Sequence, residues 1–391
     1  MNRNILLLAL SQAAVMTTIS LVLSSSALVG AQLSSPDLAT VPLAIQYLGT
    51  MVMLYPAARL MERFGRRITF CGGALIGAIG LACAAFGVRI GSFTLFAASG
   101  FLIGTFGAVG QYYRFAAADS VAPASKSLAI SWTLTGGLLA SVAGPTLAWW
   151  TKDALEPAFY ASFLSLTGVA LLGAMFATGL SLPPMMRVEN QQARRPWSEI
   201  AGNPKLVMAV LGGIVGYAVM NLLMTATPLA MMCSRLGFAQ TAEVIQWHVL
   251  AMFAPSFFTG TLIRRIGILP VMLMGCLLNL GSIAVSLTGS ELTHFEAALI
   301  LLGVGWNFLY VGATSLLTES CRKEEAARVQ AVNDTLVFLG VTAATLFSGA
   351  MVNAIGWQTV NLYAGLPILV VMAGLIRLMK WPRFRGYVRV D

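Results

Sequence analysis

The chain has 391 residues, of which 58% are hydrophobic and only 10% are charged, and its mean hydropathy is +0.80. Soluble domains usually carry about a quarter charged residues, so these values exclude a soluble globular protein and indicate a chain embedded in a membrane. The formal net charge of +9 does not require a nucleic-acid partner, because basic residues beside anionic membrane lipid account for it.

Apolar stretches long enough to span a bilayer, about 20 residues each, recur along the whole chain. Backbone groups within lipid must hydrogen-bond inside their own segment, so each stretch is predicted to be a helix. The twelve predicted spans cover residues 4–29, 39–60, 68–88, 92–113, 127–149, 159–181, 205–230, 244–263, 268–288, 296–318, 330–352 and 357–379.

The distribution of basic residues predicts the orientation of these spans. Of the 24 Lys and Arg residues, all except Arg89, Lys152 and Arg235 fall on one side of the membrane. Short loops rich in Lys and Arg remain in the cytoplasm. We therefore expect both termini and the long central loop to be cytoplasmic.

The two halves of the chain repeat each other weakly. The segment 58–67, after the second span, matches the segment 260–267, after the eighth, at a separation of about half the chain. Such a repeat predicts two six-helix units with a substrate site between them. The expected units are an N-terminal bundle at 1–182, a polar cytoplasmic linker at 183–204, a C-terminal bundle at 205–379 and a cytoplasmic tail at 380–391.

The segment from Ala58 to Arg67 resembles the signature of the major facilitator superfamily, whose usual form is Gly-x-Leu-x-Asp-Arg-x-Gly-Arg-Arg. Ala58 and Glu62 replace the usual Gly and Asp, and both replacements are mild. The resemblance implies an all-α membrane protein with twelve transmembrane helices in two six-helix bundles. It also implies gating roles for Glu62, Arg63, Arg66 and Arg67, with the less favoured alternative that these charges only fix the topology.

Two four-residue spacings, Met220-x-x-x-Met224 and His248-x-x-x-Met252, occur in successive spans. Each places two side chains on one helix face. If the spans form an antiparallel hairpin, Met224 lies level with His248 and Met220 level with Met252. Three thioethers and one imidazole form a soft, uncharged metal site that suits Cu(I). Spacing alone leaves open that the Met residues are packing and that His248 is a helix contact.

These four residues resemble the pattern of the copper-importing, CcoA-like branch of the superfamily. That resemblance implies import of copper, expected as Cu(I), across the bacterial inner membrane by alternating access, to supply the assembly of haem-copper oxidases. Copper is then the transported substrate, and no permanently bound cofactor is expected. A periplasmic metal donor and a cytoplasmic copper acceptor are the further partners that it implies.

Two other functions stay open. One is a major facilitator carrier of a small organic solute or a vitamin such as riboflavin, the substrate associated with a neighbouring branch that lacks these motifs. It predicts that transport survives substitution of Met224 and His248. The other is a membrane sensor that binds copper without moving it.

Several further residues have weaker predicted roles. Met231, Met232 and Cys233 lie between the two ligand spans at the outer mouth and are a possible metal entry site, or they pack at a helix end. Asp334 is a possible proton or metal relay, or an acid favoured by the helix dipole. Arg114 and Asp119 are predicted to pair with each other.

No enzymatic function is predicted. The five cysteines lie on different segments without a C-x-x-C spacing, which indicates neither a zinc site nor a disulfide framework. The sequence also lacks a phosphate-binding loop, so ATP-driven transport by this chain alone is not expected.

Overall fold

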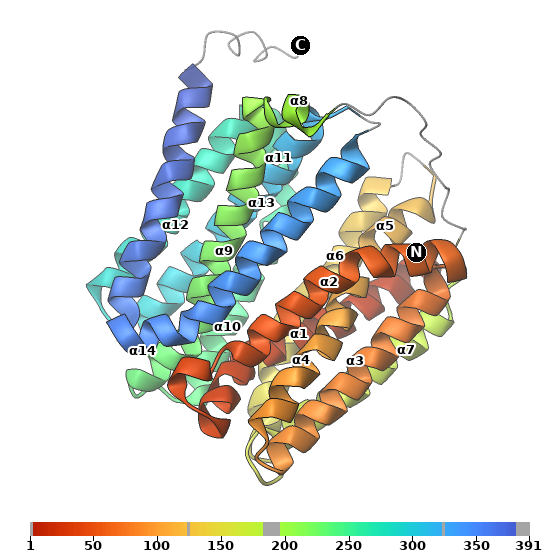
Figure 1. Ribbon diagram of the computed structural model, residues 1–391, viewed down its shortest axis with the longest axis vertical. Coiled ribbons are helices and arrows are strands. Elements are labelled where there is room, and N and C mark those ends of the chain that lie inside the picture. The colour runs from red at the N-terminus through yellow and green to blue at the C-terminus, as the bar shows by residue number, and fades with distance from the viewer. Residues whose placement is uncertain (1–2, 123–125, 183–195, 323–324, 381–391) are drawn as a thin grey trace.

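The computed structural model describes residues 3–122, 126–182, 196–322 and 325–380. Within these residues every regular element is helical. By length and composition, nine of the described helical segments suit a membrane crossing. The helices of the first half, red to yellow-green in Figure 1, pack beside those of the second half, green to blue.

The helices of the first half form one bundle. Helix α1 packs against α6 and α7, α2 packs against α4, and α3 packs against α4 and α7. The elements are α1 (Arg3–Leu33), the short helix η1 (Pro36–Leu38), α2 (Val41–Phe64), α3 (Arg66–Arg89), α4 (Phe93–Gly110), α5 (Tyr113–Asp119), α6 (Lys126–Thr151) and α7 (Tyr160–Thr178).

The helices of the second half form the other bundle. Helix α9 packs against α14 and α13, α12 packs against α13 and α14, and α10 packs mainly against α13 and, across the molecule, α6. The elements are α8 (Trp197–Ala201), α9 (Pro204–Cys233), α10 (Phe238–Phe253), α11 (Ser256–Ile266), α12 (Ile268–Thr288), α13 (Leu292–Ser320) and α14 (Ala326–Lys380).

The described helices trace the twelve predicted crossings, with two local differences. The eighth crossing is broken at Pro255 into α10 and α11, because proline removes a backbone donor and clashes with the preceding turn. The last two crossings are continuous as α14, which turns at Gly356, where φ is 77°. Only glycine adopts this conformation freely. The predicted all-α fold with two six-helix bundles is confirmed.

The sequence repeat corresponds to a repeated turn. Gly65, between α2 and α3, has φ 83° and ψ 158°, and Gly267, between α11 and α12, has φ 90° and ψ 163°. Both values need the freedom of glycine. The exact unit boundaries stay predictions, since residues 183–195 lie outside the described part of the chain, and α8 occupies the predicted linker.

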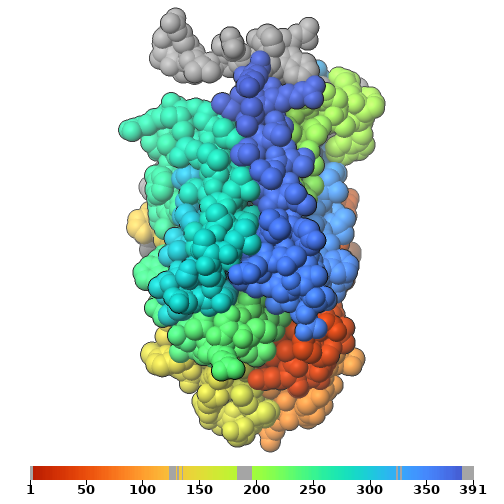
Figure 2. Space-filling model, turned by 90° about the vertical axis from the view of Figure 1, so that its left-hand side faces the viewer, coloured from red at the N-terminus to blue at the C-terminus, as the bar shows by residue number. Residues whose placement is uncertain are grey.

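The bundles meet at one end of the molecule, which we call the loop end because η1 lies there. The amide Nδ2 of Asn353 in α14 donates to Oδ1 of Asp37 in η1 at 2.7 Å. Thr40 Oγ1 donates to the carbonyl of Leu346 at 3.3 Å. Figure 2 shows η1, in red, against the blue turn of α14.

A second contact at the loop end joins the segment before α7 to the start of α10. The rings of Phe159, before α7, and Phe238, at the start of α10, meet edge to face with centroids 5.0 Å apart. The ammonium of Lys152 lies 5.5 Å from the Phe238 ring centroid. The opposite end, where α7 finishes and α9 begins, is called the linker end.

The outward faces of the second bundle are apolar. In Figure 2, α12 in teal and α14 in blue stand side by side on this face. Their exposed side chains include Leu277, Leu362, Leu366 and Val370, the last 68% exposed. A face of this kind suits hydrocarbon rather than water.

Candidate functional site

A cavity of about 140 Å³ lies between the two bundles, lined by side chains of α1, α2, α4, α9, α10, α13 and α14. A larger cavity, of about 610 Å³, lies between α2, α5 and α14. The two share Gln111, Arg114, Tyr310 and Phe338, so they adjoin. We call them the central cavity and the linker-end cavity. The molecule is thus closed at the loop end and hollow towards the linker end.

The first bundle lines the central cavity largely with neutral polar groups. Gln12 on α1, Gln46 and Thr50 on α2, and Gln111 after α4 all contribute. Thr50 Oγ1 bonds the carbonyls of Gln46 at 3.1 Å and Gly104 at 3.0 Å. Small residues allow such close helix contact within membranes. The tight packing of α4 on α2 therefore holds these polar side chains at the cavity wall.

The second bundle lines the cavity with aromatic rings. Trp306 and Tyr310 of α13 stack with centroids 5.2 Å apart and an interplanar angle of 11°. Tyr217 of α9 lies 5.3 Å from Trp306 and 5.2 Å from Tyr310, tilted against both. Phe253 and Phe338 approach the same group at 6.3 and 6.1 Å. We call these five residues the aromatic cluster.

The aromatic cluster is not among the site residues predicted from the sequence. A signal was present, because Trp306 and Tyr310 are four residues apart and share one helix face. Aromatic side chains are common in packed membrane helices, and spacing within one helix does not show that α9, α10, α13 and α14 direct their rings to one cavity. Only the packing of four helices brings them together.

The predicted ligand residues are separated by the structure into two environments. Met220, Met224 and Met252 line the central cavity. His248 does not line it; its ring is fully buried, and Nδ1 lies 2.7 Å from the carbonyl oxygen of Leu299 on α13. The expected hairpin is replaced by packing of α10 on α13 and α6, with only slight contact with α9. The four-residue metal site stays a prediction.

The possible metal entry residues do not share one environment. Met231 is completely buried, whereas Met232 is 52% exposed and Cys233 is exposed at the end of α9. In the part of the chain that the structure describes, no group of three or more His, Cys, Asp or Glu side chains is placed to hold a metal ion. The entry role of these residues also stays a prediction.

Other polar residues of the spans are mostly occupied. Asn221 lines the central cavity and donates from Nδ2 to Thr345 Oγ1. Asn307 donates to the carbonyl of Met252 at 2.7 Å and accepts from Thr259 at 2.7 Å. These bonds tie helices together within the second bundle, as is usual for amides in membranes.

Asp334 faces the linker-end cavity together with Arg114, from the other bundle. Its carboxylate accepts a hydrogen bond from the side chain of Asn333 at 3.2 Å. The predicted relay role of Asp334 is not decided by these contacts and stays a prediction.

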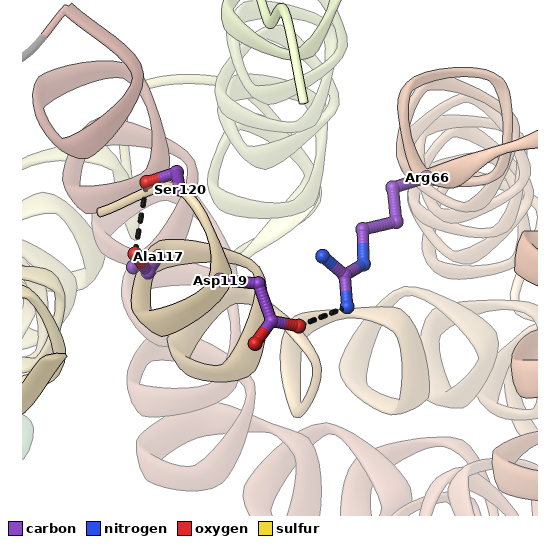
Figure 3. Close-up of polar contacts among 4 residues, drawn as sticks. All are labelled: Arg66, Ala117, Asp119 and Ser120. Carbon is purple, nitrogen blue, oxygen red and sulfur yellow. Dashed lines mark hydrogen bonds and ion pairs between the residues drawn. The ribbon is translucent and has the colours of Figure 1, made fainter. Parts of the chain in front are cut away.

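The predicted gating residues lie at the linker end. Glu62, Arg63 and Arg67 are exposed, whereas Arg66 is buried and donates to Asp119 Oδ2 at 2.6 Å (Figure 3). The Arg66 side chain is 7% exposed and that of Asp119 44%. This pair joins α3 to α5 within the first bundle, whereas the sequence analysis predicts Arg114 as the partner of Asp119.

Comparison with known proteins places these features in a family. Residues 5–345 match the Major Facilitator Superfamily. The chain is 38% identical over 382 residues to the Riboflavin transporter RfnT of Brucella anthropi, covering 97% of this chain and 96% of that protein. It is 28% identical to an uncharacterized MFS-type transporter, YdeG, of Bacillus subtilis, over 92% of this chain and 87% of that protein.

A solved structure shows the same fold. A point mutant of the nucleoside transporter NupG superposes with a TM-score of 0.71 at 15% identity, covering 97% of this chain and all of that chain. Its name and those of the sequence relatives describe transporters, which agrees with the absence of a predicted enzymatic function.

The prediction of copper import is wrong. It rested on the resemblance of four residues to a copper-importing branch, whereas a relative aligned over almost the whole chain is a riboflavin transporter. The structure agrees with this correction, because only three of the four residues line the central cavity, while Nδ1 of His248 is engaged with the backbone carbonyl of Leu299 on α13. The expected copper donor and acceptor depended on copper import, so they are no longer expected.

Proposed function

Since the chain belongs to the major facilitator superfamily, we propose that it is a secondary transporter of riboflavin or a closely similar flavin. The observation that carries this proposal is the 38% identity to a riboflavin transporter across 97% of the chain. Identity that extends over both bundles includes the helices on each side of the central cavity. Fold likeness alone would not name a substrate.

The chemistry of the central cavity supports a flat, neutral, aromatic substrate. Riboflavin has a planar ring system, an imide edge and an uncharged polyhydroxyl ribityl chain. Aromatic side chains bind planar rings by stacking, and the aromatic cluster provides such rings on one wall. Carboxamides both donate and accept hydrogen bonds, and Gln12, Gln46 and Gln111 provide them on the other.

The conformation corresponds to one state of a transport cycle. The central cavity adjoins the linker-end cavity, while the hydrogen bonds from Asn353 of α14 to Asp37 and from Thr40 to Leu346 of α14 close the loop end. The distribution of Lys and Arg predicts that the linker end is cytoplasmic. In this orientation the structure corresponds to the inward-open state of alternating access, a state that importers and exporters share, and import across the bacterial inner membrane is the direction that we propose.

The proposal is tested by uptake of isotope-labelled riboflavin in a riboflavin-auxotrophic bacterium that lacks its own importer. Cells that express the chain should accumulate label and grow at low external riboflavin, and an excess of unlabelled riboflavin should compete. Uptake equal to that of the empty vector, at a verified level of protein in the membrane, would contradict the proposal. Cellular copper measured in the same cultures should match the vector control.

A further inference from the structure

Two carboxamides of the first bundle are buried without protein partners. Gln12 is 5% exposed and Gln46 is 4% exposed, and both line the central cavity. Neither side chain forms a hydrogen bond with another residue in the part of the chain that the structure describes, and no atom of either amide is among the buried polar atoms shut off from the cavity. Both amides therefore face the cavity with donors and acceptors that the protein does not use. The cavity is therefore built to offer two amides to a ligand.

The contacts that α4 makes with α2 and α1 give the separation of these two amides along the helix axes. A Cβ at Gly104 would lie 2.1 Å from the backbone oxygen of Gln46, and a Cβ at Gly110 would lie 2.8 Å from the side chain of Val15. Six residues of helix correspond to about 9 Å, and the three residues from Val15 back to Gln12 add about 4.5 Å. The two amides thus lie about 13 Å apart along the helix axes, at opposite ends of the central cavity.

The two ends of the cavity differ in polarity. Gln46 lies in the second turn of α2 (Val41–Phe64), which begins at the closed loop end, and the adjacent Tyr47 packs with Phe338 and Val341 across the bundle interface. Beside Gln12, the lining continues through Gln111 and Arg114, which also line the larger linker-end cavity. The Gln46 end is enclosed and the Gln12 end is polar and open, and the aromatic cluster lies between them, since Tyr310 and Phe338 also line the linker-end cavity.

We propose that Gln46 recognises the imide edge of the flavin ring and that Gln12 recognises the ribityl chain; this inference rests on the proposed function. The imide edge carries an N–H donor beside carbonyl acceptors. A single carboxamide supplies the matching acceptor and donor. The ring then lies against the aromatic cluster, and the ribityl chain extends towards Gln111 and the linker end.

The reverse orientation is disfavoured by desolvation. It would place the ribityl hydroxyls at the enclosed end, where Tyr47, Phe338 and Val341 offer few hydrogen-bond partners. Burying hydroxyls without partners is unfavourable. It would also leave the imide edge of the ring at the open, polar end, where water competes for its hydrogen bonds.

Competition for the uptake of labelled riboflavin tests this assignment with two analogues. Riboflavin methylated at N3 loses the imide donor and gains bulk at the edge, whereas lumiflavin keeps the ring but carries a methyl group in place of the ribityl chain. The wild type should prefer riboflavin over each analogue by about tenfold or more, because a site built for a hydrogen bond rejects a ligand that lacks it.

The two glutamine variants should lose different selectivities. In Gln46→Leu, riboflavin should bind about tenfold more weakly and lose its advantage over the N3-methyl analogue, while its preference over lumiflavin persists. In Gln12→Leu, the preference over lumiflavin should fall and that over the N3-methyl analogue should persist. Gln246→Leu is the matched control, because Gln246 lies on α10 outside the central cavity, and it should keep both preferences.

A second variant at position 46 keeps the assignment testable if Gln46→Leu does not fold. Gln46→Glu keeps the side-chain size but removes the amide donor, so it should also weaken riboflavin binding. The assignment is overturned if the wild type does not discriminate against the N3-methyl analogue, or if both selectivities fall together in either leucine variant. Absence of riboflavin uptake by the wild type would instead overturn the proposed function itself.

Discussion

The two walls of the central cavity differ in chemistry although they belong to repeated halves of the chain. The first bundle contributes three glutamines beside one tyrosine, and the second contributes the aromatic cluster and three methionines beside one asparagine. The turns at Gly65 and Gly267 nevertheless have almost the same backbone conformation. The repeat has therefore kept the architecture while the walls diverged. An asymmetric cavity can orient an asymmetric ligand, which a symmetric pair of walls could not.

A substitution in α4 should displace the first-bundle wall more easily than any single change displaces the second-bundle wall. In Gly104→Ala, the new methyl group would meet the backbone of Gln46 at 2.1 Å, so α2 must move. We expect a loss of about 1–3 kcal/mol in unfolding free energy and loss of most riboflavin uptake. Thermal unfolding in detergent and uptake at matched expression measure both effects.

The matched glycine control is Gly168→Ala in α7, where no atom lies within 4 Å of the new methyl group. Alanine is the better helix former, so this variant should be as stable as the wild type or more so. Equal stability of the two variants would show that the close approach of α4 to α2 does not position the wall.

The second-bundle wall should be weakened by removing its largest ring. Trp306→Ala removes the ring stacked on Tyr310 and should weaken apparent riboflavin affinity about tenfold. Trp306→Phe should recover part of it. The control is Trp150→Ala, because Trp150 is 69% exposed and faces away from the cavity. Equal uptake curves for Trp306→Ala and wild type would remove the aromatic cluster from the binding site.

The contact between the walls at the loop end should have a smaller effect. Asp37→Ala removes the 2.7 Å bond from Asn353, an exposed contact, and should increase outward opening by about threefold. A cysteine at the cavity residue Ile19, in a background without the native cysteines, should then react faster with a thiol reagent applied at the loop end. Glu291→Ala is the control, since Glu291 is an exposed acid at the start of α13 whose side chain forms no capping hydrogen bond.

The smallest effect is expected at the methionines. Met224→Leu conserves volume and apolar character, so riboflavin uptake should stay within about twofold of wild type. Cellular copper should be the same for this variant, the wild type and the empty vector. A copper level that rises with the wild type and falls with Met224→Leu would show that the chain imports copper through the methionines.

Much of the fold could be predicted from the sequence. Long apolar runs have few structural solutions in lipid, and the predicted spans therefore agree with the described helices, except at Pro255 and Gly356. The site was predicted less well. Met220, Met224 and Met252 do reach the central cavity, but His248 turns towards Leu299, because the expected hairpin did not include α13 as the nearer neighbour of α10.

The sequence by itself determined that the chain crosses the membrane repeatedly in two related halves, because hydropathy and glycine turns act locally along the chain. The tertiary structure alone decided which side chains share a cavity. Gln46 and Phe338 are far apart in the sequence, and they line opposite walls of one cavity only because the two bundles pack together. Spacing within a helix specifies a face, but the neighbour of that face depends on every other helix in the bundle.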